Sequence, residues 1–172
     1  KKLLVKERRY QMKKNKTKLL TRIAILVALS AVAAYVPLPS PTGTVALDSA
    51  PGYFAVLVFG GGSGAVVLGL GHIFSSLKSG FPLGALHLLI AFLMAGCGLV
   101  FNWIYRRSNI ILASIAAVIL NGIGISAVLI PILGYGFFAA MTLPLLTGSL
   151  VNVLAAGILY HLLQNRIEDI GN

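Results

Sequence analysis

Charged residues are almost absent from the long central part of this chain. Between residues 23 and 165 the charged side chains are Asp48, Lys78, Arg106 and Arg107. Over the whole chain 10% of residues are charged and 58% are hydrophobic, whereas a soluble domain carries roughly 25% charged residues. So few charges cannot cover a surface that faces water. The composition therefore predicts an all-α integral membrane protein, because in lipid every backbone polar group must be satisfied internally.

Apolar runs separated by proline, glycine and polar turns predict a bundle of six transmembrane helices, each needing about 20 apolar residues to cross. The loop Pro37–Ser49 follows the first run, and Gly134–Phe138 is expected as a loop before the last. The second and third runs are short, so whether segment 50–60 fully spans the membrane stays open. The six expected segments are Leu19–Val36, Pro51–Phe59, Ser63–Leu77, Leu83–Tyr105, Asn109–Ile130 and Met141–Leu163.

The chain divides into a basic leader at 1–18, a membrane domain at 19–165 and a polar tail at 166–172. Met12 is a plausible natural start, so we expect residues 1–11 to precede the native protein and leave them out of the fold prediction. A signal peptide is disfavoured, because the apolar run Leu19–Val36 is longer than a typical signal core.

Lysine and arginine are distributed very unevenly along the chain. Ten of the fourteen precede Ile23, where they lead into an apolar run. A nucleic-acid surface would instead spread basic residues over a folded face, so no nucleic-acid partner is expected. Six crossings with both termini in the cytoplasm would place every lysine and arginine except Lys78 on the cytoplasmic side. This orientation satisfies the positive-inside rule.

Groups that could catalyse a reaction or hydrolyse a nucleotide are scarce. Among the four acidic residues only Asp48 lies outside the leader and tail, so no carboxylate pair lies at membrane depth. No phosphate-binding loop of the GxxxxGK[ST] type is present. His72 and His87 lack a third ligand for a metal, and Cys97 is expected to be a small buried hydrophobe. We therefore expect no enzyme, cofactor or metal, and energy for any transport must come from a partner.

Polar side chains in the apolar segments gather in the half of the bundle expected to face outward. Such residues are costly in lipid and tend to face the bundle interior, so we expect a solute pocket there with Asp48 as its main anchor. Each residue has a structural alternative: asparagines bond across helices, aromatics form interfacial belts, and Asp48 caps a helix. The candidate substrate-binding residues are Thr44, Asp48, Ser49, Tyr53, His72, His87, Asn121, Tyr135 and Asn152.

The basic N-terminus, six short helices, the long first outer loop and the Ala24-xxx-Ala28 motif carry a family resemblance. From about residue 17 to 165 the chain resembles the S components, the substrate-binding membrane subunits of energy-coupling factor (ECF) vitamin transporters. The resemblance implies that Ala24 and Ala28 dock a transmembrane coupling subunit. Two cytoplasmic ATPases would complete the transporter complex. It also implies a pocket near the outer surface, lined by the first loop and helices four to six, in a bacterial plasma membrane.

Residues 39–60, PSPTGTVALDSAPGYFAVLVFG, and 79–95, SGFPLGALHLLIAFLMA, look most like the α-ribazole subgroup of that family. This likeness implies high-affinity capture of α-ribazole, the nucleoside of the cobalamin lower ligand, on the extracellular side. Two alternatives remain open. One is an S component for riboflavin, pantothenate or a modified nucleobase. The other is an assembly subunit of a membrane complex, which transports nothing.

Overall fold

The computed structural model describes the backbone of residues 2–171 and the side chains of residues 15–165. Within this part the chain is helical and contains no β-strand, only an isolated bridge between Pro37 and Ala46. This confirms the all-α prediction. The elements are α1 (Lys2–Ala33), the 3₁₀ turn η1 (Leu47–Ser49), α2 (Ala50–Phe59), α3 (Gly61–Lys78), α4 (Leu86–Arg107), α5 (Ile110–Ile119), the π-helix η2 (Leu120–Ile125), α6 (Ser126–Val128) and α7 (Ile130–Gly171).

In the part of the chain that the structure describes, three stretches are long and apolar enough to cross a membrane by length and composition: Leu86–Arg107, Ile110–Val128 and Ile130–Asn165. The helix Leu47–Phe59 is apolar but shorter than these spans. The membrane assignment therefore rests on three helical segments. They are α4, the continuous helix made of α5, η2 and α6, and α7. The count of six crossings stays a prediction.

Two helix boundaries differ clearly from the sequence prediction. The first helix ends at Ala33 rather than Val36, and its backbone continues without a break through the basic leader. The prediction of a loop at Gly134–Phe138 is wrong, because the helix resumes directly after Gly134. Gly134 alone takes a left-handed backbone (φ 77°), which glycine adopts at no steric cost. One residue therefore makes the break for which the sequence suggested five.

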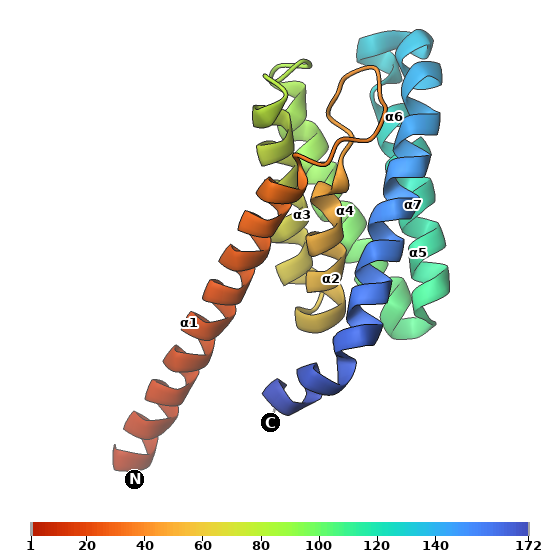
Figure 1. Cartoon of the computed structure of the whole chain (residues 1–172). Coiled ribbons are helices and arrows are strands. Elements are labelled where there is room, and N and C mark those ends of the chain that lie inside the picture. Colours follow the sequence, from red (N-terminus) through yellow and green to blue (C-terminus); the bar gives the residue numbers. More distant parts are fainter. Residues whose placement is uncertain (1, 172) are drawn as a thin grey trace.

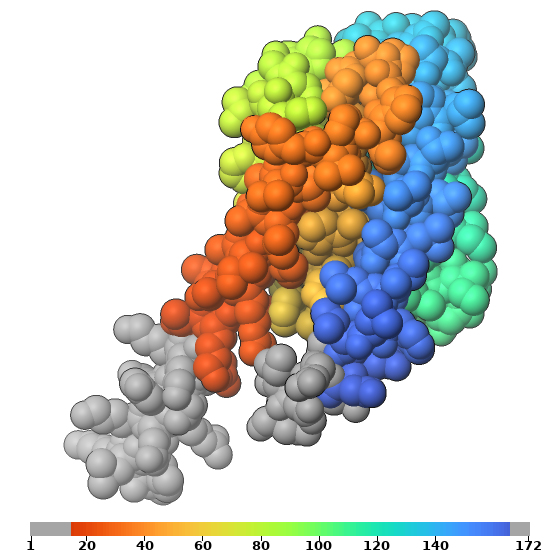
Figure 2. Space-filling view, viewed as in Figure 1, coloured from red at the N-terminus to blue at the C-terminus, as the bar shows by residue number. Residues whose placement is uncertain are grey.

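The helices form a bundle with both chain ends at the same end of the molecule (Figure 1). Helix α3 packs against α4 and α2, and α7 packs against α2 and α5. Helix α1 contacts α3 and α2 along its later part and slants away from the bundle toward its N-terminus (Figure 1). Segment 34–46 covers the opposite end, where the space-filling view shows it between the α3–α4 turn and α7 (Figure 2).

Small residues allow close packing in the part of the bundle that lies away from segment 34–46. A Cβ atom at Gly64 of α3 would collide with the Val56 side chain of α2, so glycine is needed where these two helices meet. Beside this contact the ring of Tyr53 packs on Phe101, with centroids 5.3 Å apart. These rings join the main cluster of buried apolar residues, which α2, α3, α4, α5 and α7 share. This core lies below the end of the bundle that segment 34–46 covers.

Candidate functional site

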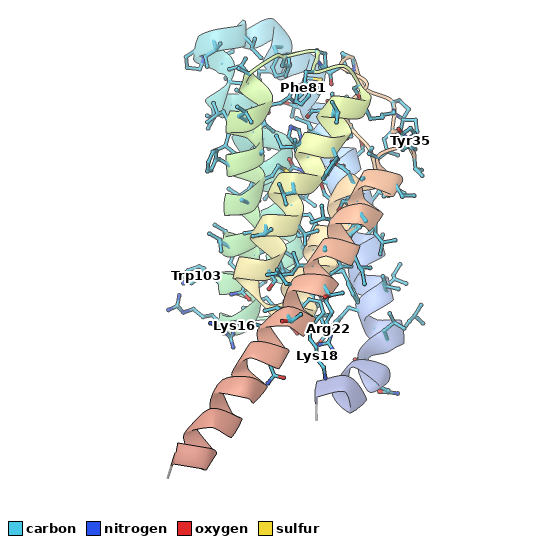
Figure 3. All side chains as sticks on the ribbon, turned by 90° about the vertical axis from the view of Figure 1, so that its left-hand side faces the viewer. Lys16, Lys18, Arg22, Tyr35, Phe81 and Trp103 are labelled. Carbon is cyan, nitrogen blue, oxygen red and sulfur yellow. The ribbon has the colours of Figure 1, made fainter. Side chains whose placement is uncertain are left out.

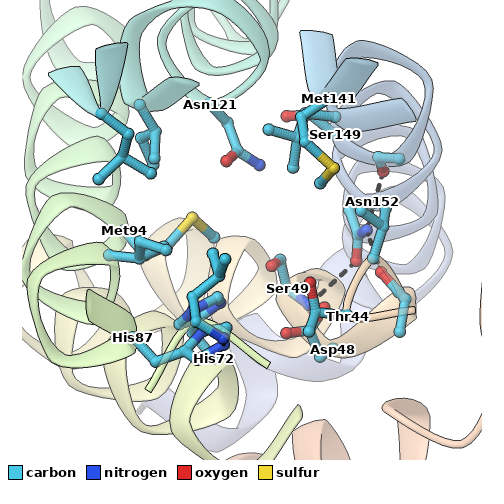
Figure 4. A pocket seen from close by; sticks show the side chains of 18 of the residues that line it. Thr44, Asp48, Ser49, His72, His87, Met94, Asn121, Met141, Ser149 and Asn152 are labelled. Atoms are coloured by element: carbon cyan, nitrogen blue, oxygen red, sulfur yellow. Dashed lines mark hydrogen bonds between the residues drawn. The ribbon is translucent and has the colours of Figure 1, made fainter. Parts of the chain in front are cut away.

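A cavity lies beneath segment 34–46, enclosed by η1, α3, α4, η2 and α7 (Figure 4). Its volume is about 50 Å³. Seven of the nine residues predicted from the sequence line it, although they come from distant parts of the chain. They are Thr44, Asp48, Ser49, His72, His87, Asn121 and Asn152.

Asn152 of α7 ties the first loop to the bundle. Its side-chain amide donates to the backbone carbonyls of Ala46 and Gly148, each at 2.8 Å. Its Oδ1 accepts the backbone N–H of Ser49 at 3.0 Å. Both N–H donors of the amide are thus used, and one lone pair of Oδ1 remains. Asn152 is therefore mainly a support that holds η1 at the cavity edge.

Loop contacts close the roof of the cavity. Ser75 Oγ donates to the carbonyl of Thr44 at 3.1 Å, and Ser79 Oγ donates to that of Gly43 at 3.0 Å. On the other side, a Cβ atom at Gly148 would collide with the side chain of Val45. The loop consequently lies on both α3 and α7 through a few contacts, without regular secondary structure of its own.

Asp48 is buried, with 5% of its surface exposed. It lies in η1, outside the three candidate spans. Burial raises the pKa of its carboxyl group to about 7, although hydrogen bonds from its own backbone and from Ser75 and Ser49 oppose the rise. Near neutral pH this carboxyl can therefore donate or accept a hydrogen bond.

The two histidines are joined by Ser76 into one hydrogen-bonded cluster. Leu83 N–H donates to His87 Nε2 at 3.3 Å, so a neutral His87 carries its proton on Nδ1. That nitrogen lies 2.8 Å from Ser76 Oγ and 3.1 Å from His72 Nε2. The Ser76 hydroxyl donates onward to the carbonyl of His72 at 2.7 Å. Both nitrogens of His87 are thus occupied, and this residue shapes the wall rather than offering a free group.

Asn121 differs from the other polar residues because it makes no hydrogen bond to any residue that the structure describes. It is 8% exposed, and Figure 4 shows its amide pointing into the cavity from the side opposite Asp48. The π-helix η2 contains Asn121, and such π-helical turns are frequent at functional sites. A buried amide without a partner costs free energy unless a ligand or water satisfies it. Asn121 is therefore the clearest vacant hydrogen-bonding group of the site.

Apolar side chains that the sequence analysis did not select form the rest of the wall. Met94 lies seven residues after His87 on α4, and Met141 lies eleven before Asn152 on α7. Both spacings place the pair on one helix face, so this signal was present in the sequence. Thioether side chains adapt their shape and pack well on aromatic rings. The remaining apolar lining residues include Leu83, Ile90, Ile125, Leu129, Phe137 and Leu145.

The other two predicted residues lie elsewhere. Tyr53 is fully buried in the core, and its hydroxyl makes no hydrogen bond to any residue whose side chain is described. Tyr135 is 76% exposed. Neither residue lines the cavity.

Comparison with known families decides what kind of protein has this cavity. Residues 18–165 match the family model "ECF transporter, substrate-specific component". The chain belongs to this family. ECF substrate-specific components are multi-pass membrane proteins that bind a small-molecule substrate. They are not enzymes, and they work with a membrane coupling subunit and ATPases.

The fold of this ECF component is similar to that of a solved S component of a bacterial ECF transporter. The TM-score is 0.64 over 90% of this chain and 98% of that chain, at 22% sequence identity. A search of curated proteins finds no match. The family assignment thus establishes a substrate-binding subunit of an ECF importer, and the solved structure supports its fold.

The two alanines expected to dock the coupling subunit are exposed on α1. Ala24 and Ala28 both face away from the bundle, whereas Leu26 and Ser30 of the same helix are buried. Lys16, Lys18 and Arg22 lie near the end of the bundle opposite Tyr35 and Phe81 (Figure 3). The ECF component therefore exposes both alanines on α1, away from the cavity.

Proposed function

We propose that this ECF component captures a small, uncharged cyclic solute from the extracellular side in the cavity beneath segment 34–46. The best candidate is α-ribazole. The observation that carries the proposal is the unpartnered amide of Asn121, which faces Asp48 across a space walled by Met94 and Met141. Hydrogen-bonding groups at the edges and apolar walls between them suit a flat ring that carries hydroxyl groups.

The charges of the side chains that line the cavity restrict the class of solute that can bind. Among the described residues that line the cavity there is no lysine or arginine, and Asp48 is the one acidic residue. A buried phosphate or carboxylate on the solute would lack a cationic partner, which costs several kcal/mol. This argues against pantothenate, which carries a carboxylate. Nucleosides, modified nucleobases and riboflavin are compatible, and the likeness of segments 39–60 and 79–95 to the α-ribazole subgroup favours α-ribazole among them.

An α-ribazole molecule can be matched to the cavity by its chemistry. Its benzimidazole is flat and apolar and suits the space between Met94, Met141 and Phe137. Its ribose hydroxyls can bond to the Asp48 carboxyl and the Asn121 amide. His87 and Asn152 hold these walls in place through the bonds described above.

The cavity must widen before such a ligand can bind. A volume of about 50 Å³ holds a few water molecules, whereas pockets for drug-sized ligands reach roughly 300–1,000 Å³. The adaptable elements are segment 34–46, which lies on the bundle through a few contacts, and the flexible side chains of Met94 and Met141. We propose that solute binding displaces the loop outward and that closure follows.

Delivery inward would use the coupling module. In this proposal six segments cross the membrane with both termini in the cytoplasm, Ala24 and Ala28 contact the coupling subunit, and two cytoplasmic ATPases supply the energy. The exposure of both alanines supports this arrangement. Lys16, Lys18 and Arg22 lie near the end of the bundle opposite Tyr35 and Phe81. These basic residues support a cytoplasmic location for that end.

A thermal-shift screen of the purified protein tests the substrate. The ligands are α-ribazole, riboflavin, pantothenate and adenine. At a thousandfold excess over its dissociation constant, the true ligand adds about 4 kcal/mol of stability. We expect α-ribazole to stabilise the wild type, and Asp48→Ala to weaken its binding by roughly 5- to 150-fold. Stabilisation by riboflavin or adenine alone would reassign the substrate, and no stabilisation by any of the four would show that the substrate is another solute.

A further inference from the structure

A second hollow lies on the opposite side of the molecule from α1. It is a groove of about 840 Å³ between α5 and α7, which run side by side (Figure 1). It shares no lining residue with the cavity described above. It is also remote from Ala24 and Ala28, since α1 lies across the bundle (Figure 1). The groove is therefore independent of both the solute site and the proposed docking face.

The walls of the groove are almost entirely aliphatic. Ile111 and Ile115 of α5 are 67% and 50% exposed, and Leu154 and Ile158 of α7 are 53% and 61% exposed. On α5 the groove runs from Ile110 to Ile119, which at 1.5 Å per residue is about 14 Å. One leaflet of hydrocarbon is about 15 Å thick. The groove thus matches the depth of a single leaflet.

Polar groups gather at one end of the groove, where α4 ends beside residues 160–164 of α7. The hydroxyls of Tyr105 and Tyr160 lie 3.5 Å apart there, and His161 and Gln164 complete this mouth. The end is the basic one, because Arg106 and Arg107 lie in the chain directly between the groove residues Tyr105 and Ile110. Both arginines are exposed, and the Arg107 guanidinium lies over the ring of Trp103, 4.6 Å from its centroid.

We propose that this groove binds one anionic phospholipid from the leaflet at the basic end of the bundle. Its acyl chains lie along the aliphatic walls of α5 and α7. Its phosphate faces the tyrosine hydroxyls and His161, beside the turn that carries Arg106 and Arg107. Basic groups beside a pocket between membrane helices attract anionic headgroups, at about 1 kcal/mol for each arginine. A partner helix is about 10–12 Å wide, which suits a slot between two touching helices less well than acyl chains.

Native mass spectrometry from vesicles tests the proposal. The full chain is reconstituted in equal amounts of phosphatidylglycerol and phosphatidylcholine with the same acyl chains, then released gently. We expect one retained phosphatidylglycerol per protein. Replacing both Arg106 and Arg107 by glutamine should reduce the preference for phosphatidylglycerol by at least tenfold, at about fivefold for each arginine.

A glycine on the groove wall allows a matched pair of variants. A Cβ at Gly157 meets only Ile110 Cδ1, at 3.8 Å, so Gly157→Leu fills the groove without a backbone clash. Gly96 of α4 has nothing within 4 Å of its Cβ position and does not line the groove. We expect Gly157→Leu to lose the bound lipid and Gly96→Leu to keep it, with thermal unfolding confirming that both are folded. If Gly157→Leu does not fold, the arginine variant decides.

Three results would overturn the proposal. The first is equal retention of the two lipids by the wild type. The second is undiminished retention by folded Gly157→Leu. The third is displacement of the lipid when the coupling subunit and ATPases assemble with the protein, since the groove would then be a protein interface.

Discussion

The side-chain oxygen of Asn152 accepts a hydrogen bond from the backbone N–H of Ser49, at 3.0 Å, although 103 residues separate them in the chain. This contact joins the last helix to the turn that positions Asp48. It also explains how an irregular first loop holds a polar group at a defined place above an apolar bundle. The predictions below follow from this arrangement.

Removing the Asn152 side chain should loosen the loop. Asn152→Ala leaves the buried Ser49 N–H and the Ala46 carbonyl without their partner, and each loss costs about 1–3 kcal/mol. We expect the free energy of unfolding to fall by about 3 kcal/mol in denaturant titrations. Thr147→Ala is the control, because Thr147 is exposed and bonds only within its own helix, so its effect should stay within about 0.5 kcal/mol. Equal stability of the two variants would contradict the role of Asn152.

Enlarging Gly148 should push the loop off the bundle. A methyl group at Gly148 meets the Val45 side chain, and such overpacking typically costs about 1–3 kcal/mol. Hydrogen exchange of the amides in 38–46 should speed up by roughly tenfold in Gly148→Ala. Gly136→Ala on the same helix meets nothing within 4 Å and should leave that exchange unchanged. Protection equal to wild type in Gly148→Ala would show that the loop does not rest on this residue.

The raised pKa of Asp48 makes stability depend on pH. Between pH 4 and 7 the folded protein keeps the carboxyl proton while the unfolded chain has lost it, so the folded state binds more protons and stability falls as pH rises. A shift from 3.8 to about 7 corresponds to roughly 4 kcal/mol across this range. The difference in thermal stability between ligand-free wild type and Asp48→Asn should show this fall, because the comparison cancels the groups that titrate in both proteins. A difference that stays constant from pH 4 to 7 would contradict the burial of this carboxyl.

Larger side chains on the alanine face should block transport without affecting capture. Ala24→Leu and Ala28→Leu add bulk to exposed positions of α1 and should abolish uptake by the assembled complex. Solute binding by the isolated protein should remain unchanged, because neither residue lines the cavity. Ala140→Leu, an exposed alanine of α7, should transport normally. Normal uptake by both α1 variants would show that docking uses another surface.

Composition and periodicity predicted the helical class. The depth of polar residues in the apolar segments selected most of the polar residues that line the cavity. Asp48, His87 and Asn121 could be selected because polar groups in an apolar segment are costly and face inward. Met94 and Met141 could not be selected by that rule, since a methionine on a helix face is normally ordinary core. They become recognisable only once a polar residue seven or eleven positions away is known to face the cavity.

The π-helix at Leu120–Ile125 and the single-residue break at Gly134 were not predictable from local pattern. The π-helix depends on tertiary packing. A Cβ at Gly122 would collide with Leu146 of α7, so the π-helical turn forms where the two helices come very close. Tyr53 is a similar case: its position near the outer loop suggested a ligand wall, but packing against Phe101 places it in the core.

Identification of the bound solute tests the central claim most directly. Wild-type protein and Asn121→Ala would be purified from membranes in mild detergent, and the small molecules released on unfolding would be analysed by mass spectrometry. Because Asn121 bonds to no described residue, its removal should leave the thermal stability of the ligand-free protein almost unchanged. We predict one uncharged ring compound per wild-type molecule, and at least tenfold less in Asn121→Ala. Equal amounts of solute in the two proteins would contradict a binding site in this cavity.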